Sequence, residues 1–423
     1  MLTKLMSDLA SGGISRKDTL AACLERINSD PAAAAIFSSV DAAGIQAAID
    51  RPADGGAPRP LSGIAIAVAD SLLAKGLPDE ASSALLAGFV SPYDSAAVEL
   101  LKAADATLSG KTRIPELAVT PVAGEPEPVA VDRSAEAVVK GMCHAAVGVD
   151  CDGEFRRLAA AGGLCGIKAS YGAVSRHGVV SIAPSMETVS VSARSVGDLI
   201  PVLQAVGGND PRDITTVVEP LPDLASGSWK SVSGLRVGWI GDVDKGEAGD
   251  PIDALVKQGA TAAPLSLPSF KHWGAVHSIL YHAEASSQLG RYDGIRFGRY
   301  PTEAKNWDSI YYKARAAFGL SAKRAAMLGA FALSTEGIDV YHQQALRLRR
   351  RINEEFAKVW EMVDVLVVPA SLESGRTAVR VGANLSGCPA LALAGAGVEI
   401  WAEPFKAYNA LRAGLGIRGE TRD

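Results

Sequence analysis

The chain has 423 residues, of which 48% are apolar, and its formal net charge is −5. A chain of this size and apolar content buries a large core. The acidic balance offers no basic face, so we expect no nucleic-acid partner. The N-terminus lacks the apolar core of a signal peptide, and no apolar run reaches the roughly 18 residues of a membrane span, so we expect neither export nor membrane insertion.

The number and spacing of the cysteines and histidines indicate in which cell compartment the protein works and whether it binds a metal. The cysteines are odd in number and widely spaced, which argues against a disulfide framework and favours a reducing compartment, so we expect a cytoplasmic location. The six histidines are dispersed, and no C-x-x-C or H-x-x-x-H pair is present, so we expect no metal and no cofactor. The cysteines are Cys23, Cys143, Cys151, Cys165 and Cys388.

Apolar residues at helical spacing predict helices within residues 1–50, and the proline and glycine of residues 51–60 predict a loop. We expect this N-terminal helical segment, residues 1–60, to pack on the remainder of the chain. The whole chain, residues 1–423, is expected to form a single domain.

Three apolar runs predict buried strands at residues 64–69, 235–240 and 364–368. Each run is apolar on both faces, which is typical of a strand covered by helices on either side. Helical patterns alternate with them, including an amphipathic helix at residues 340–362. These patterns predict an α/β fold with a single large mixed, largely parallel central sheet flanked by helices on both faces.

The strongest local signal is a glycine-rich stretch at residues 148–178, which begins GVDCDGEFRRLAAAGG. Its glycines and small residues are typical of a tight turn whose main-chain N–H groups face a pocket. Cys151, Asp152 and Gly153 lie at the start of this stretch. Such a turn can act as an oxyanion hole.

This stretch resembles the G-S-D-T-G-G-S-x-R-x-P-A-x-x-C-G motif of the amidase-signature family. A second stretch at residues 283–298, which contains EASS and RYDGIRFG, resembles most closely the A subunits of glutamyl-tRNA(Gln) amidotransferases. The resemblance covers roughly residues 5–415. It implies the amidase fold, and it implies that Asp150 caps the turn and pairs with Arg156.

The same resemblance implies that the catalytic side chains have changed. Family members use a lysine that relays a proton through one serine to activate a second, nucleophilic serine. The corresponding positions hold Ala69, Ala130 and Glu154. Alanine transfers no proton, and a carboxylate repels a developing oxyanion. We expect these three residues to lie close together around a former oxyanion turn of Cys151, Asp152 and Gly153.

From these substitutions we predict a catalytically inactive amidase homologue that serves as a structural or regulatory subunit of a larger complex. Other protein subunits are the expected partners, and no small-molecule substrate is expected. For the contact surface we expect a short C-terminal helix at residues 405–411 with an exposed apolar edge.

An alternative interpretation is an amidase-fold hydrolase or amidotransferase subunit with a repurposed active site, in which Glu154, Asp152 or Cys151 reacts. Carboxylates that converge on one pocket raise each other's pKa. Against this, charged groups in a closed site are usually paired, and the expected partner of Glu154 is then Arg133, Arg156 or Arg157.

Overall fold

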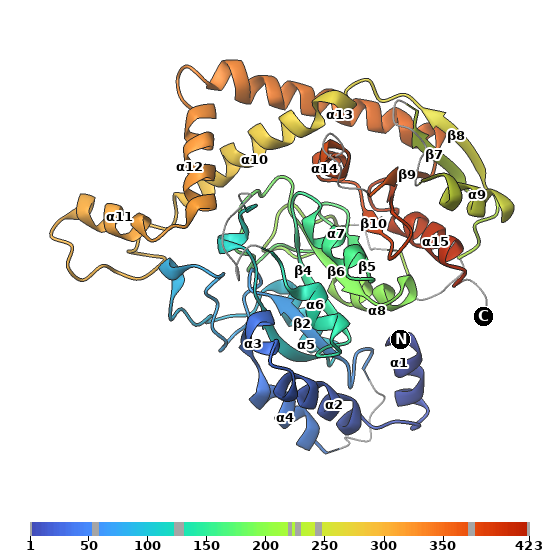
Figure 1. Cartoon of the computed structure of the whole chain (residues 1–423), viewed down its shortest axis with the longest axis horizontal. Helices are drawn as coiled ribbons and strands as arrows, with labels where there is room; N and C mark the ends of the chain where they lie inside the picture. Colours follow the sequence, from blue (N-terminus) through green and yellow to red (C-terminus); the bar gives the residue numbers. More distant parts are fainter. Residues whose placement is uncertain are drawn as a thin grey trace.

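One eleven-stranded sheet organises the part of the chain that the computed structural model describes, which is residues 2–52, 59–121, 131–218, 222–224, 230–241, 248–370 and 377–420 (Figure 1). Its strands lie in the order β1-β3-β2-β4-β6-β5-β10-β11-β9-β7-β8. They are β1 Phe37–Val40, β2 Ala65–Ala69, β3 Thr107–Thr112, β4 Ala145–Asp150, β5 Cys165–Lys168, β6 Thr188–Ala193, β7 Arg236–Ile240, β8 Thr261–Leu265, β9 Val365–Pro369, β10 Ala390–Ala392 and β11 Val398–Ala402.

Helices cover both faces of this sheet, as the sequence predicts. They are α1 Leu2–Ala10, α2 Arg16–Ser29, α3 Ala33–Ile36, α4 Ala42–Asp50, α5 Ala96–Ala103, α6 Ser134–Val139, α7 Glu154–Ala161, α8 Val196–Val206, α9 Gly249–Lys257, α10 Trp273–Leu289, α11 Trp307–Ala316, α12 Leu320–Ala332, α13 Gln343–Met362, α14 Thr377–Ser386 and α15 Ala407–Arg418.

The alternation of side chains along β2 shows how the two layers form. Ile66 and Val68 lie in the core beneath α5 and α8, whereas Ala65 and Ala67 lie in the core beneath α2 and α6. All five residues of β2 are buried. Small alanines on one face let the N-terminal helices approach the sheet closely, so the predicted strand and its two-sided burial are confirmed.

The large mixed sheet is confirmed, but its parallel share is smaller than the sequence suggested. Parallel pairs lie only on the two flanks, at β3-β2-β4 and β9-β7-β8. The centre, from β4 through β6, β5, β10 and β11 to β9, is antiparallel throughout. The reason is that β6 inserts between β4 and β5, so two strands joined by the helix α7 are not neighbours.

The C-terminal helix differs from its prediction. It spans Ala407–Arg418, and Ala410, Leu411 and Leu415 are buried against the sheet layer of β10 and β11. The expected exposed apolar edge at residues 405–411 is therefore wrong, because the apolar side of this helix completes the main core.

Among the described helices, none is long and apolar enough to cross a membrane.

Candidate functional site

The turn between β4 and α7 is shaped by a left-handed glycine and by carboxylates. Gly153 has φ +89°, and a Cβ atom at this position would lie 3.0 Å from Nη2 of Arg156. Glycine is therefore required both by the backbone and by the close approach of Arg156. The turn directs the first residues of α7, Glu154 and Phe155, into a small cavity.

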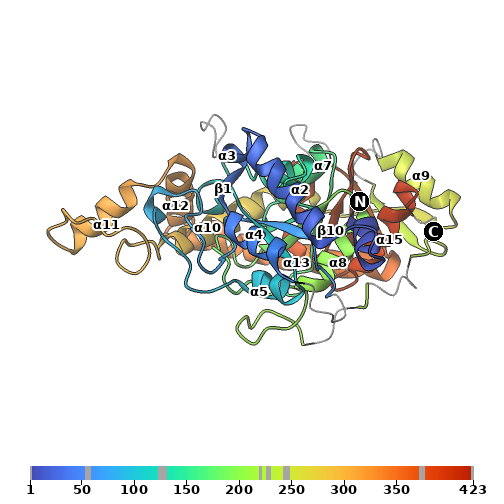
Figure 2. The ribbon, with the colours of Figure 1, turned by 90° about the horizontal axis from the view of Figure 1, so that it is seen from below.

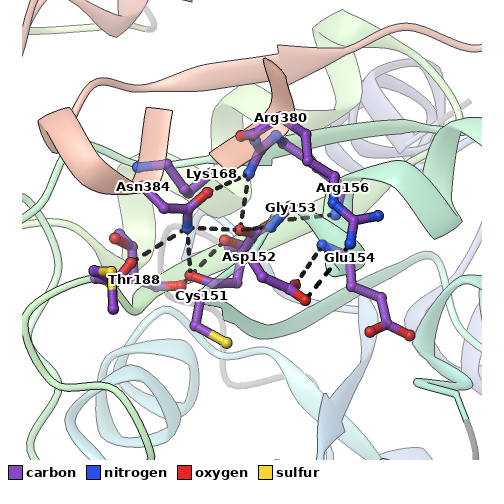
Figure 3. A network of polar contacts seen from close by, with 12 residues as sticks. Cys151, Asp152, Gly153, Glu154, Arg156, Lys168, Thr188, Arg380 and Asn384 are labelled. Atoms are coloured by element: carbon purple, nitrogen blue, oxygen red, sulfur yellow. Dashed lines mark hydrogen bonds and ion pairs between the residues drawn. The ribbon is translucent and has the colours of Figure 1, made fainter. Parts of the chain in front are cut away.

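A fully buried ion network holds this turn in place (Figure 3). Nη1 of Arg156 lies 2.8 Å from Oδ1 of Asp150, and Nε lies 3.0 Å from Oε2 of Glu399 on β11. Asn384 on α14 donates to the same Asp150 oxygen at 3.0 Å. The predicted Asp150–Arg156 pair is thus present, and it ties β4 and α7 to elements far along the chain.

Burial and charge act in opposite directions within this network. Burial is the largest single effect and opposes ionisation of Asp150, but the Arg156 charge, the Asn384 hydrogen bond and the Lys168 charge together lower the pKa of Asp150 below its ordinary value. Lys168 on β5 lies close by, and burial together with the Arg156 charge lowers the pKa of its amine to about 8. The turn is therefore held by the positive charge of Arg156, which keeps the carboxyl group of Asp150 ionised.

The N–H groups of the turn bond to the turn's own carboxylates. Gly153 N–H donates to Oδ1 of Asp150 at 2.9 Å, and Glu154 N–H donates to Oδ1 of Asp152 at 2.9 Å. Asp152 in turn lies 3.8 Å from Nη2 of Arg380 on α14. An oxyanion at these two N–H groups would have to displace a carboxylate.

The cavity in front of α7 has a volume of about 40 Å³. Space of this size holds one or a few water molecules, since one water needs roughly 10–15 Å³ measured in this way. Its polar lining brings the predicted residues Cys151, Asp152 and Glu154 together with Ser71, Thr120 and Asp132. The sequence-based prediction of a pocket at this turn is consistent with this geometry.

Two carboxyl groups of the cavity have raised pKa values. Burial and then the charge of Asp152 raise the pKa of Glu154 to about 8, and Asp132 contributes further in the same direction. Burial raises the pKa of Asp132 to about 6, although Ser134 donates hydrogen bonds to it. At neutral pH Glu154 is therefore mostly protonated and Asp132 mostly ionised.

Glu154 has no ion pair within the described residues, so the expected pairing with Arg133, Arg156 or Arg157 is wrong, although the charge of Arg157 acts on Glu154 and opposes the rise of its pKa. Arg156 is occupied by Asp150 and Glu399, and Arg133 lies 3.2 Å from Glu136. The Glu154 carboxyl is thus left to the cavity, which explains its raised pKa.

Two side chains of helix α10, His277 and Tyr281, form hydrogen bonds with the turn and with the cavity wall. His277 Nε2 donates to the main-chain oxygen of Cys151 at 3.0 Å, and burial lowers the pKa of this imidazole, so it is neutral. The Tyr281 hydroxyl accepts from Thr120 N–H at 2.7 Å, and the Thr120 hydroxyl reaches Asp152 at 3.2 Å. The cavity walls therefore form one connected hydrogen-bonded unit.

The structure describes two of the three positions of the expected triad. Ala69 is the last residue of β2. Its Cβ and the ring of Phe155 both lie against Gly148, so Ala69 lies beside the start of α7. Glu154 faces the cavity. Ala130 lies outside the described residues. The altered triad itself remains a prediction from the resemblance.

A buried lysine does lie next to β2. Lys111 on β3 is adjacent to Val68, and its Nζ lies 3.1 Å from Oδ1 of Asp70 and also contacts Asp79. Burial lowers the pKa of Lys111 to about 8. The amine is thus engaged by Asp70 and Asp79, and Lys111 is not among the residues that line the cavity.

Sequence reasoning missed Asp132, His277, Tyr281 and Arg380. Asp132 gave one usable signal, since an acidic residue two positions before a helix start at Ser134 is typical of a capping turn. The other three sit on helices, at intervals that look like ordinary helix faces. Only the fold brings α10 and α14 to the turn.

Within the described residues, no group of three or more histidines, cysteines or acidic side chains is arranged to hold a metal ion.

Comparison with known proteins gives a consistent family. The model of the family described as Amidase matches residues 18–126 and 134–386. A protein of Anaeromyxobacter sp. (strain K), named as the A subunit of glutamyl-tRNA(Gln) amidotransferase, is 36% identical over 390 residues, covering 86% of this chain and 79% of that protein.

Two solved structures share the fold over nearly the whole chain. One is a chain from a vestigial protein complex linked to the origins of an s-triazine catabolic enzyme, with TM-score 0.82, 20% identity and coverage of 99% and 98%. The other is native peptide amidase from Stenotrophomonas maltophilia, with TM-score 0.79, 21% identity and coverage of 99% and 96%.

These relatives contradict the prediction of an inactive, non-enzymatic homologue, because the relatives at 36% identity are named as parts of amidotransferases. The expectation that no small-molecule substrate binds is wrong for the same reason. The physical error was to equate a changed triad with lost chemistry. The cavity retains titratable groups of its own, and one of them, Asp132, lies two residues after Ala130 in a segment to which the prediction assigned no reacting group.

Proposed function

Because the chain belongs to the amidase family, we propose that it is an amide-processing enzyme, a hydrolase or an amidotransferase subunit, with a repurposed active site. Its catalytic groups are carboxyls in the cavity at the start of α7. Glu154 acts as the general acid and Asp132 as the general base. Asp152 holds the turn that presents them.

The observation that carries this proposal is the pair of carboxyls with separated pKa values in one cavity. Glu154 has a pKa of about 8 and Asp132 a pKa of about 6. Two titratable groups whose environments separate their pKa values in this way provide one proton donor and one proton acceptor at neutral pH. The cavity has room for the water molecule that such a pair would activate.

The reaction follows from these protonation states. Asp132 takes a proton from water, whose oxygen attacks the amide carbon and forms a C–O bond. Glu154 donates its proton to the departing nitrogen as the C–N bond breaks, so an amide and water become a carboxylic acid and an amine or ammonia. Transfer of the proton from Asp132 to Glu154 restores both groups.

Cys151 has a different role in this scheme. Burial, together with the charges of Asp152 and Asp150, raises the pKa of its thiol well above the ordinary value. A thiol held in this state is a poor nucleophile, since the thiolate is the reactive form. We therefore assign Cys151 to the cavity wall.

Ammonia release tests the proposal. Purified protein is incubated with glutamine, asparagine and simple primary amides, and we expect turnover of at least one of them. Glu154→Gln and Asp132→Asn should each lower kcat about a hundredfold or more, whereas Glu336→Gln, at an exposed position, should not change it. Turnover that persists unchanged in both cavity variants would refute the assignment.

Assembly with other protein subunits and a cytoplasmic location also belong to the proposal. The relatives are named as one component of an amidotransferase, and the structural neighbour comes from a vestigial protein complex, so both support an assembly of several chains. The five cysteines are all free, which suits a reducing compartment.

A further inference from the structure

The outer face of α12 carries an exposed apolar stripe. Leu320, Met327, Leu328 and Phe331 have exposed fractions of 60%, 74%, 44% and 56%. Their spacing places them on one side of the helix, one above the other. Single exposed apolar residues are ordinary, but a contiguous apolar row on one helix marks a contact surface.

The stripe is fixed in this outward orientation. On the opposite side of α12, Ala322, Ala325 and Gly329 are buried against α10. A Cβ atom at Gly329 would collide with the main-chain oxygen of His282, so the two helices touch at their backbones. Rotation of α12 to bury the stripe would lose this contact.

The π-helical turn extends the apolar surface, and α11, the preceding helix along the chain, carries exposed aromatic side chains of its own. The ring of Tyr341, in the π-helical turn Ile338–His342, lies 5.4 Å from that of Phe331 between centroids, tilted by 46°. Trp307 and Tyr312 on α11 are 67% and 79% exposed. Both views show α11 and α12 at the end of the molecule farthest from the two termini, with α11 projecting beyond the body (Figures 1 and 2).

Charge distinguishes this region from the rest of the chain. The elements of this surface, α11, α12 and the π-helical turn, contain four lysines and arginines against two acidic residues, Asp308 and Asp339, a net charge of +2 in a chain of −5. Lys323 and Arg324 lie within the stripe itself, and α12 has no acidic residue. Within the described residues, Lys323, Arg299 and Lys305 form no ion pair.

We propose that the surface of α11, α12 and the π-helical turn, centred on Leu320, Met327 and Phe331, is the docking site for a different protein that presents an amphipathic helix with an acidic rim. The apolar row of that helix packs on the stripe, and its carboxylates face Lys323 and Arg324. This proposal does not rest on the catalytic assignment, since the surface lies outside the cavity.

Charge selects this occupant over two others. A second copy of the chain would bring the same net positive surface against itself, which like-charge repulsion opposes. Nucleic acid would use the cations and the exposed rings of Trp307 and Tyr312, but the aliphatic row of Leu320, Met327 and Leu328 would find no partner on it, and the chain as a whole is acidic. An acidic amphipathic helix satisfies both the aliphatic row and the cations.

Site-specific photo-cross-linking in the native host tests the proposal. The photoreactive residue p-benzoylphenylalanine replaces Met327, and the matched control carries it at Val256, an exposed apolar position that is 44% exposed on the outer side of α9. Mass spectrometry then reads the sequence of the attached peptide. The peptide is synthesised, and its binding to the purified chain is measured by fluorescence anisotropy at low and high salt.

The expected product is one protein, attached at Met327 and not at Val256, through a segment with apolar residues at helical spacing and a surplus of Asp and Glu. Its synthetic peptide should bind about tenfold more weakly to the Lys323→Glu/Arg324→Glu variant, a loss expected for two charge pairs. Thermal unfolding of that variant should match the wild type. Attachment to another copy of this chain, to nucleic acid or to the same proteins as the control, or no attachment at all, would overturn the proposal.

Discussion

At the scale of single residues, Glu154 is the group whose state matters most. A carboxyl with a folded-state pKa raised from 4.5 to about 8 holds its proton in the native protein over a range in which the unfolded chain has lost it. The native state then binds more protons, so stability falls as pH rises from about 4.5 to about 8.

Glu154→Gln should remove this pH dependence. We expect the variant to match the wild type near pH 4 and to be the more stable of the two at pH 9, because the amide has no proton to lose. Urea denaturation across this pH range measures the effect, with Glu336→Gln as the exposed control. Parallel stability curves for the wild type and Glu154→Gln would show that Glu154 ionises normally.

Gly153 gives a second prediction at this scale. Gly153→Ala should destabilise the protein by about 1–3 kcal/mol, because the left-handed backbone disfavours a side chain and the new methyl group would press on Arg156. Gly12→Ala is the control, since Gly12 has φ +75° but no atom within 4 Å of its Cβ position. Equal losses in the two variants would mean that contact with Arg156 costs nothing.

Some of these residues could be predicted from the sequence and some could not. The pairing of Asp150 with Arg156 follows from a motif seven residues long, because a turn and the first residues of α7 bring its ends together. The state of Glu154 could not be predicted, because its largest cause is burial, which only the fold determines, and because Asp132 and Arg380 from distant segments add to the local charges of Asp152 and Arg157. The same reason explains the wrong ion-pair prediction for Glu154.

At the scale of elements, the buried Arg156 links four parts of the chain. It bonds to Asp150 at the end of β4, to Glu399 on β11 and to Asn384 on α14. Removing one partner from a buried ion network leaves charges without compensation in a medium that solvates them poorly. The network therefore fixes where α7 begins.

Arg156→Met should destabilise the protein by about 3–5 kcal/mol, because Asp150 and Glu399 would remain buried without their cation. Arg212→Met is a matched control, since Arg212 also bridges two carboxylates, Glu99 and Asp210, but its side chain is 43% exposed. We expect that control to lose less than about 1 kcal/mol. Urea midpoints measure both, and equal losses would contradict a special role for Arg156.

The spacing of apolar residues correctly predicted the strands and the helix whose own sequence shows which faces are buried. β2, β7, β9 and the long helix α13 lie within a few residues of their expected positions. The helix α15 was correctly placed but its apolar side was assigned to the surface, because its partners β10 and β11 are short strands without a clear pattern. A helix pattern shows which side is apolar, but not what covers that side.

At the scale of the whole molecule, the order of strands was beyond sequence reasoning. The insertion of β6 between β4 and β5 and the antiparallel centre depend on where long connections return to the sheet. The exposed stripe on α12 is also a property of the assembled fold, since it becomes visible only once α10 has covered the opposite side. Contact surfaces and cavities are therefore the features that the structure adds.

The cavity at the start of α7 is the part of the molecule on which the proposed function depends. Its base and acid should set the pH range of catalysis, because Asp132 must be ionised above about 6 and Glu154 protonated below about 8. Rate should therefore rise and fall with pH around a maximum near neutrality.

The pH dependence of kcat/KM for ammonia release tests this most directly. We predict a bell-shaped profile with limbs near pH 6 and pH 8 for the wild type, loss of the alkaline limb in the residual activity of Glu154→Gln, and loss of the acidic limb in Asp132→Asn. A profile whose two limbs are unchanged in both variants would contradict the account.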